Sequence, residues 1–187
     1  MAPKRKITKE DIISGALELA KTDPERAWKA RGLAAHLGIS TQPIFTHFSG
    51  MEEVKECVLK RAYALFEKRM QEEIEKGKYP VYKASGMAYV SFAREEPALF
   101  RLLYMRSRRG ENTEGDRLTE GLWGVVESQT GIGGDKAKLF HLEMWSCVHG
   151  IATMLATGFL DLNEEAISLI LTDLYQGLVK NEKEAVQ

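Results

Sequence analysis

The sequence predicts an all-α protein, in which an N-terminal three-helix unit is joined to a larger helical bundle. Apolar residues recur at three- and four-residue spacing along almost the whole chain, and no stretch alternates at the two-residue period of a strand. Only five prolines occur among the 187 residues, so long helices are permitted. With 44% hydrophobic and 28% charged residues, the composition is that of a globular protein with a sizeable core.

About nine helices can be placed from their start and stop signals. Thr8 is a good N-cap for the first, Asp11 completes a capping box, and Lys21-Thr22-Asp23-Pro24 ends the helix. Its buried stripe is expected to comprise Ile12, Ile13, Ala16, Leu17, Leu19 and Ala20. The remaining helices are expected at 29–37, 41–47, 50–75, 81–95, 97–107, 116–130, 135–158 and 164–181.

Three further signals support these boundaries. Ser49 can cap helix 50–75 in a second capping box with Glu52, and Asn163 is a good N-cap for the last helix. The polar loop Arg108–Gly115 separates two helices of the C-terminal half.

The distribution of charged, cysteine and apolar residues limits the partners and the location that we expect. Residues 1–50 hold eight Lys or Arg and five Asp or Glu, a net charge of +3 within a chain of net charge −1, so only this end suits a polyanion. Cys57 and Cys147 fit no metal spacing and no disulfide framework, which favours a reducing, cytoplasmic setting. The longest uncharged stretch, Met144 to Leu160, is too short and too polar to span a membrane.

Residues Arg31 to Phe48 fit a helix-turn-helix. Such a unit packs two short helices at a steep angle through a tight turn, which restricts the residue type at several positions. Leu33 and Leu37 lie one turn apart, and the small Ala34 lets the second helix approach. Gly38 ends the first helix where the chain reverses, because glycine adopts a positive φ without penalty. The remaining positions supply two buried apolar residues, two candidate N-caps and a first-turn proline: Ile39, Ile44, Ser40, Thr41 and Pro43.

Residues 7–60 resemble the DNA-binding domain of the TetR (tetracycline-repressor-like) family. Leu37-Gly38-Ile39-Ser40 matches the family's Ala-Gly-Val-Ser type of turn, and Ile44-Phe45-Thr46-His47-Phe48 matches its Leu-Tyr-x-His/Tyr-Phe recognition helix. In the C-terminal part, residues 97–103 and 145–150 resemble elements of one subgroup of this family. The resemblance implies a ligand-responsive transcriptional repressor that binds a palindromic operator in double-stranded DNA as a homodimer.

The resemblance also implies which side chains meet DNA. Helix 41–47 would lie in the major groove, where each base pair displays a distinct hydrogen-bond pattern. Thr41 and Gln42 are expected to read bases, since a Gln amide can pair with adenine through two hydrogen bonds. Lys29 and Arg31 are expected to clamp phosphates, and Lys4-Arg5-Lys6 would form a basic arm. The full set of expected contacts is Lys29, Arg31, Ser40, Thr41, Gln42, Pro43, Phe45, Thr46 and His47.

Two positions depart from the family pattern. Phe45 stands where the family usually has Tyr, so a hydroxyl-to-phosphate hydrogen bond is missing. Gly50-Met51 stands where a Lys usually opens the next helix, although free N–H groups at a helix start can bind a phosphate. We therefore expect DNA binding with few charged anchors and a shallow salt dependence.

Residues 1–50 are thus expected to form the DNA-binding domain, and 51–187 the effector-binding and dimerisation domain, linked through helix 50–75. Methionine and aromatic residues gather in the second part. Each alone is ordinary core, but together they indicate a pocket for a small apolar effector, as the resemblance implies. The expected lining is Tyr63, Phe66, Met87, Phe92, Phe100, Tyr104, Trp123, Met144, Trp145 and His149.

The helices near 135–158 and 164–181 are the expected homodimer interface. The first carries small residues that permit close helix approach, and the second adds an apolar stripe. The small residues are Gly150, Ala152, Ala156 and Gly158, and the stripe is Ile167, Ile170, Leu171 and Leu174. The small residues could instead pack within one chain.

Other functions stay open. A helical small-molecule-binding or interaction protein with a weakened DNA-binding head would fit the same sequence, and so would a transcriptional activator of this fold. No catalytic set is recognisable, so we do not expect an enzyme. His141, Glu143 and His149 match no metal-ligand spacing, and neither a metal nor a cofactor is expected.

Overall fold

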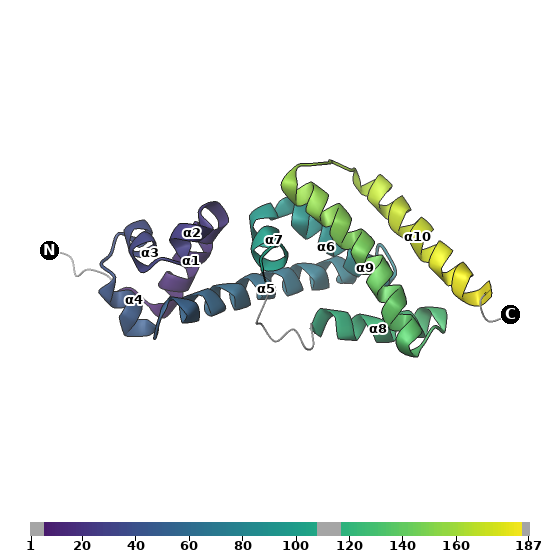
Figure 1. Ribbon diagram of the computed structural model, residues 1–187, viewed down its shortest axis with the longest axis horizontal. Coiled ribbons are helices and arrows are strands. Elements are labelled where there is room, and N and C mark those ends of the chain that lie inside the picture. Colours follow the sequence, from purple (N-terminus) through teal and green to yellow (C-terminus); the bar gives the residue numbers. More distant parts are fainter. Residues whose placement is uncertain (1–5, 108–116, 185–187) are drawn as a thin grey trace. The chain divides into compact units, whose positions relative to one another are not determined.

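The computed structural model describes residues 6–107 and 117–184, apart from the side chains of 117–121. This part of the chain contains ten helices and no strand (Figure 1), which confirms the all-α class. The helices are α1 Lys9–Thr22, α2 Pro24–Ala27, α3 Ala30–Leu37, α4 Gln42–His47, α5 Met51–Glu75, α6 Val81–Glu95, α7 Pro97–Tyr104, α8 Arg117–Thr130, α9 Gly134–Thr157 and α10 Glu164–Glu184.

The tenth helix is α2, which the sequence analysis missed. The carboxylate of Asp23, which ends α1, accepts a hydrogen bond from the Arg26 N–H at 3.1 Å and thereby starts another turn at Pro24. The predicted loop Arg108–Gly115, and Lys4-Arg5 of the predicted basic arm, lie outside the described residues.

The described residues divide into two compact units. The N-terminal unit lies within Met1–Phe66 and Ala98–Arg106, and the C-terminal unit within Glu67–Pro97 and Ser107–Gln187. The predicted boundary at residue 50 instead coincides with the start of α5. The N-terminal unit keeps this helix as far as Phe66, because the apolar residues at four-residue spacing on it are buried: Val54, Val58, Ala62 and Phe66.

Capping hydrogen bonds fix the start of α1, as predicted. The Thr8 hydroxyl accepts from the Asp11 N–H at 3.1 Å, while the Thr8 N–H donates to the Asp11 carboxylate at 2.9 Å. The last helix also starts as predicted, because the Asn163 side chain accepts from the Ala166 N–H at 2.8 Å.

The start of α5 differs from the predicted capping box. The N–H and hydroxyl of Ser49 donate to the Glu53 carboxylate at 2.8 and 3.0 Å, so its partner is Glu53 and not Glu52. Glu53 also accepts from the Lys9 ammonium at 2.9 Å, which ties α5 to α1. These hydrogen bonds, that from the Ser49 backbone foremost, lower the pKa of Glu53 to about 2.

Close approach of α1 and α3 determines which face of α1 is buried. A Cβ at Gly15 would lie 2.4 Å from Cδ2 of Leu37, so only glycine fits here without rearrangement. Ile13 and Leu17, which were expected in the buried stripe, are only half-buried. The buried residues of α1 are Ile12, Gly15, Ala16, Leu19 and Ala20, so four of the six predicted residues are buried and Gly15 joins them.

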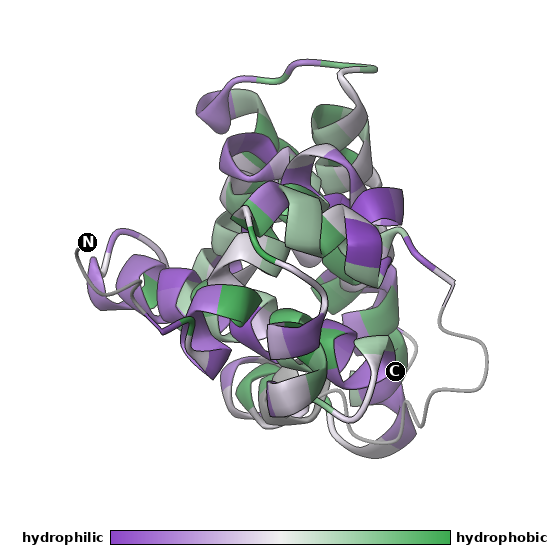
Figure 2. Cartoon of the chain, turned by 90° about the vertical axis from the view of Figure 1, so that its left-hand side faces the viewer, coloured by the Kyte–Doolittle hydropathy of each residue, from purple (hydrophilic) through white to green (hydrophobic). Residues whose placement is uncertain are grey.

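The C-terminal unit is built around α6, which packs against α8, α9 and α10. Of its residues, Tyr82, Ala84, Ser85, Met87, Ala88, Tyr89, Val90, Phe92 and Ala93 are buried. A Cβ at Gly86 would touch Val148 of α9 and Leu171 of α10 at 3.4 Å, so the three helices meet at this glycine. Figure 2 shows hydrophobic and hydrophilic residues alternating within single helices, as in amphipathic helices packed around a core.

Candidate nucleic-acid interface and ligand cavity

The turn between α3 and α4 has the predicted left-handed glycine, but the predicted cap is not formed, because Thr41 at the N-cap of α4 makes no side-chain capping hydrogen bond. Gly38 adopts a φ of 66° and ends α3, and the Ile39 N–H closes the turn on the Ala34 carbonyl at 3.0 Å. Leu33 and Ile44 are both 0% exposed and anchor the two helices in the core of the N-terminal unit. Because Ile44 fixes the inward face of α4, its neighbours along the helix are directed outward.

None of the nine residues predicted to contact DNA is buried. Phe45 is 53% exposed, an unusual position for a large aromatic side chain without a partner. Exposed side chains are those of Lys29, Arg31, Ser40, Gln42, Phe45 and Thr46, and half-buried ones are those of Thr41, Pro43 and His47.

Two of these residues also have structural partners that the sequence did not reveal. Nε2 of His47 lies 3.1 Å from the Ile7 carbonyl oxygen, which joins the end of α4 to the segment before α1. The Thr46 hydroxyl donates to the Gln42 carbonyl at 2.9 Å and leaves its methyl group and lone pairs exposed. His47 therefore positions α4, whatever else it contacts.

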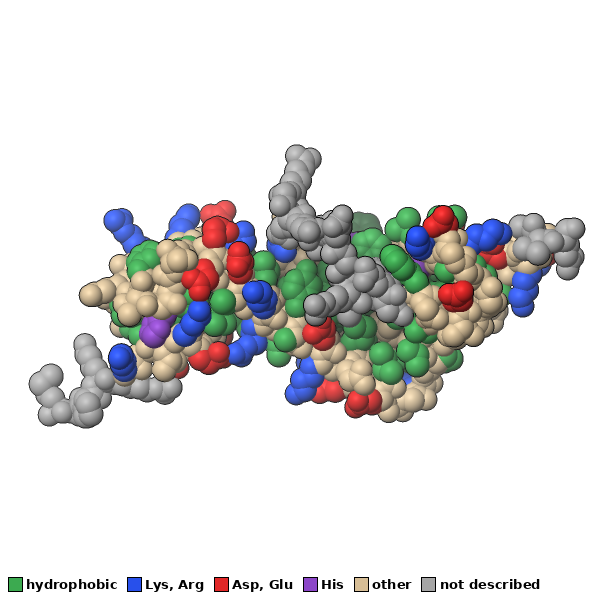
Figure 3. All heavy atoms as spheres, turned by 90° about the horizontal axis from the view of Figure 1, so that it is seen from below, with side chains coloured by type: hydrophobic (Ala, Val, Ile, Leu, Met, Phe, Trp, Pro, Cys, Tyr) green, Lys and Arg blue, Asp and Glu red, His purple; other side chains and the backbone are tan. Residues whose placement is uncertain are grey.

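The charges around α4 favour few phosphate contacts. The side chains of Lys29 and Arg31 make no hydrogen bond or ion pair with any described residue, so both cations are available. At the start of α5, however, the Glu53 carboxylate already accepts from the Ser49 N–H, and a phosphate there would meet this negative charge. Figure 3 shows basic and acidic side chains intermingled over the N-terminal unit on the face it draws.

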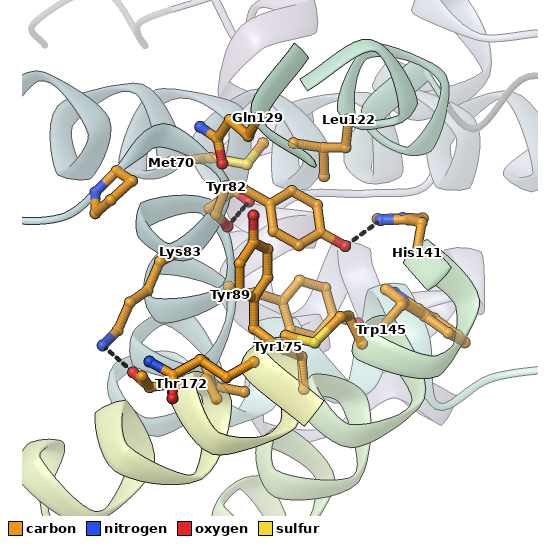
Figure 4. Close-up of a pocket in the computed structure, with 17 residues that line it drawn as sticks. Met70, Tyr82, Lys83, Tyr89, Leu122, Gln129, His141, Trp145, Thr172 and Tyr175 are labelled. Atoms are coloured by element: carbon orange, nitrogen blue, oxygen red, sulfur yellow. Dashed lines mark hydrogen bonds between the residues drawn. The ribbon is translucent and has the colours of Figure 1, made fainter. Parts of the chain in front are cut away.

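A cavity of about 390 Å³ lies within the C-terminal unit. Its wall is mostly aromatic and apolar, with residues from α5, α6, α8, α9 and α10 (Figure 4). The lining includes Met70, Tyr82, Lys83, Tyr89, His141, Met144, Trp145, Thr172 and Tyr175. The volume is within the range of small-molecule sites, which is roughly 300–1,000 Å³.

Two hydrogen bonds between tyrosines and histidines join α6 to α9. The Tyr82 hydroxyl lies 2.9 Å from Nδ1 of His141, and the Tyr89 hydroxyl lies 2.9 Å from Nδ1 of His149. Burial raises the pKa of Tyr82 and lowers the pKa of both histidines, because the charged forms are poorly solvated there. The neutral forms of Tyr82, His141 and His149 are therefore favoured. The Trp145 ring also stacks on the His149 ring, with centroids 4.8 Å apart.

The structure places the ten predicted ligand residues in different regions, which corrects the expectation of one shared pocket. Met144 and Trp145 line the cavity, and His149 lies behind its wall through its contacts with Tyr89 and Trp145. Met87, Phe92 and Trp123 belong to the same unit but not to this lining. Four others pack in the N-terminal unit, where the Tyr104 ring contacts the rest: Tyr63, Phe66, Phe100 and Tyr104.

Several of the lining residues that were not predicted from the sequence share one face of α6, and others come from α5, α8, α9 and α10. Tyr82, Ser85, Gly86 and Tyr89 follow the three- and four-residue spacing of a helix and all line the cavity. The spacing of these residues is visible in the sequence. It did not predict a cavity, because a helix face of polar and small residues can also pack in an ordinary core.

Two classes of site have no support in the part of the chain that the structure describes. No three metal-ligating side chains lie together among residues 6–107 and 122–184. None of the described helices is both long enough and apolar enough to cross a membrane.

Comparison with known proteins links both units to one class of regulator. Residues 82–174 match the family described as the tetracyclin repressor-like C-terminal domain. An uncharacterised helix-turn-helix-type transcriptional regulator of Mycobacterium tuberculosis is 23% identical over 160 residues, which cover 83% of this chain and 73% of the relative. The crystal structure of a TetR-like transcriptional regulator from Rhodococcus sp. RHA1 has the same fold, with a TM-score of 0.68, 15% identity and 94% of each chain covered.

Proposed function

Since the chain belongs to the TetR family of transcriptional regulators, we propose that it is a ligand-responsive repressor that binds a palindromic operator as a homodimer. The observation that carries this proposal is the exposed face of α4, held by a buried Ile44 and a left-handed Gly38. A short helix presented in this way on a helix-turn-helix fits the major groove of DNA.

Each of the nine residues expected to contact DNA has a role in the proposal. Thr41 and Gln42, at the N-terminal end of α4, read base edges, and Gln42 suits adenine. Phe45 and Thr46 contact thymine methyl groups and the sugar–phosphate backbone. Lys29 contacts phosphates. Arg31 also contacts a phosphate. Ser40, Pro43 and His47 contact the DNA around the two ends of α4.

Exposed apolar side chains on α9 and α10 support the homodimer. Leu139 and Leu142 of α9 are each 54% exposed, and Leu169 of α10 is 61% exposed. Gly150 and Gly177 lie within the same two helices, and a Cβ built at either meets nothing within 4 Å, so none of the described residues requires a glycine there. A second copy packed on these helices would account for both features.

The small residues of α9 are thus divided between two roles. Ala152 and Ala156 are 0% and 4% exposed and pack within the chain, and Gly158 ends the helix with a φ of 68°. Gly150 is the one of the four predicted residues that lies inside the helix with nothing within 4 Å of a built Cβ among the described residues, and it supports the interface.

The cavity is the proposed effector site, and α5 is the proposed connection to the DNA-binding head. This one helix contributes Val54, Val58 and Ala62 to the core of the N-terminal unit and Met70 to the cavity wall. A ligand that shifts α5 in each copy would change the spacing of the two heads, which must be roughly 34–36 Å for successive major grooves.

A second candidate function is a helical small-molecule-binding protein with a weakened DNA-binding head. Phe45 in place of a hydroxyl-bearing residue and the Glu53 carboxylate at the start of α5 favour it. Selection of bound sequences from random DNA separates the two functions, because the regulator enriches a palindrome of two half-sites. No enrichment would favour the second candidate.

Gln42→Ala provides the residue-level test on the selected sequence. We expect a loss of about 1–3 kcal/mol and relaxed preference at one base pair in each half-site. Gln71→Ala, another exposed glutamine but on α5, is the matched control and should leave binding unchanged.

The salt dependence of binding tests the phosphate contacts. With Lys29 and Arg31 as the two phosphate-binding cations of each head, the slope of log affinity against log salt should be roughly −4, and a slope near −10 would contradict these contacts.

A further inference from the structure

The cavity holds a cation but no carboxylate among the described residues that line it. The Lys83 ammonium donates to the Thr172 hydroxyl at 2.7 Å and lies 4.9 Å from the centre of the Tyr79 ring. No carboxylate of the described residues lies within ion-pair distance of it. Because an ammonium has three donors and Thr172 takes one, Lys83 can still bind an anion.

His141 provides a second polar group for a ligand. The residue is 6% exposed, and its Nε2 has no hydrogen-bond partner among the described residues. If the Tyr82 hydroxyl donates to Nδ1, the neutral ring carries its proton on Nε2, and this N–H then has no acceptor among the described residues. A buried N–H without a partner costs stability, so a ligand acceptor would bind there favourably once a small side-chain movement opens Nε2, which is closed to solvent in this structure, to the cavity.

Aromatic side chains line much of the cavity that these two groups share. Figure 4 shows Lys83 with Thr172 on one side of the labelled side chains, and His141 with Tyr82 on the other. The rings of Tyr89, Trp145 and Tyr175 contribute to the lining, and such rings favour stacked or edge-on contact with another ring.

We propose that the cavity binds a small aromatic carboxylate, whose anionic group meets Lys83 and whose far end places a hydrogen-bond acceptor against His141. Only the role of this ligand as an effector depends on the proposed function. Binding itself is a property of the C-terminal unit.

Calorimetry on the full chain tests the ligand class with matched probes. Naphthoate should bind at least about tenfold more tightly than naphthylmethanol, which has the same rings but no charge, a difference of about 1.4 kcal/mol. Lys83→Met should abolish this preference, whereas Lys83→Arg should retain it. Lys78→Met is the matched control, because Lys78 is paired with Glu164 and does not line the cavity.

The His141 end is tested with a hydroxynaphthoate, whose hydroxyl oxygen can accept a hydrogen bond from the Nε2–H group. It should bind about threefold to tenfold more tightly than naphthoate, and this advantage should disappear in His141→Phe. Melting temperatures of all variants would show that they are folded.

Equal affinity for the acid and the alcohol, or no binding by any probe, would overturn the proposed ligand class. Retention of the acid preference in Lys83→Met would overturn the role of Lys83. Operator affinity is measured separately with naphthoate at saturation. If it is unchanged although naphthoate binds through Lys83, the effector role fails and the ligand class stands.

Discussion

Replacing Gly150 by alanine tests the proposed homodimer directly. Gly150 lies within α9 and does not have a positive φ, so alanine can adopt its backbone conformation. A Cβ at this position meets no heavy atom within 4 Å among the residues that the structure describes. In an isolated chain, the substitution should therefore stabilise α9 by roughly 0.5–1 kcal/mol, since glycine is a poor residue inside helices.

A second copy on this face reverses the expected effect. Two added methyl groups, one from each copy, would enter a closely packed interface, and overpacking costs about 1–3 kcal/mol at each site. The dimer would then lose roughly 2–6 kcal/mol, which corresponds to a dissociation constant raised about 30-fold or more.

Analytical ultracentrifugation over a range of concentrations measures the dissociation constant, and a thermal melt measures stability. Gly124→Ala is the matched control, because Gly124 is an exposed glycine of α8 with nothing within 4 Å of a built Cβ. The control should raise the melting temperature by roughly 2–4 °C or less and leave the dimer unchanged. If Gly150→Ala behaves in the same way as the control, this face is not the interface and the reasoning is refuted.

Three further predictions concern the head and the cavity. Gly32→Ala should destabilise the N-terminal unit by about 1–3 kcal/mol in chemical denaturation, because its Cβ would lie 2.4 Å from the Arg26 carbonyl oxygen; unchanged stability would contradict this close approach. His47→Ala should cost about 0.5–1.5 kcal/mol and speed amide exchange at the start of α1, and unaltered exchange would argue against its structural role. Because burial lowers the pKa of His141 below 6.5, the unfolded chain binds protons more readily than the folded one, so stability should fall as pH drops below about 6.5 and level off above it. Denaturant melts across this range should show a weaker pH dependence in His141→Phe, and identical profiles would count against the assignment.

The parts of the fold that local chemistry controls were predictable. The capping box at Thr8, the left-handed Gly38 and the cap at Asn163 all depend on residues within a few positions of one another, and each has the predicted geometry. Helix α2 was not predicted because Asp23 has two roles, ending α1 and capping the short helix that follows it.

The ligand cavity was largely unpredictable for the opposite reason. Its key contacts join residues that are far apart in the chain, 59 positions for Tyr82 and His141 and 89 for Lys83 and Thr172. Apolar periodicity indicates which face of a helix is buried but not which other helix covers it, since the hydrophobic effect has no direction. Tyr63 and Trp145 therefore looked alike in the sequence, although they belong to different units.

By itself, the sequence determined the helical class, the turn of the helix-turn-helix and its outward-facing residues, because backbone conformation and side-chain periodicity act over one or two turns. The tertiary structure alone decided that Glu53 caps α5, that Ala152 and Ala156 face inward while Gly150 faces open space, and that Lys83 and His141 share one cavity. Each of these depends on which helices pack together, and that choice is made by the shape and volume of whole faces.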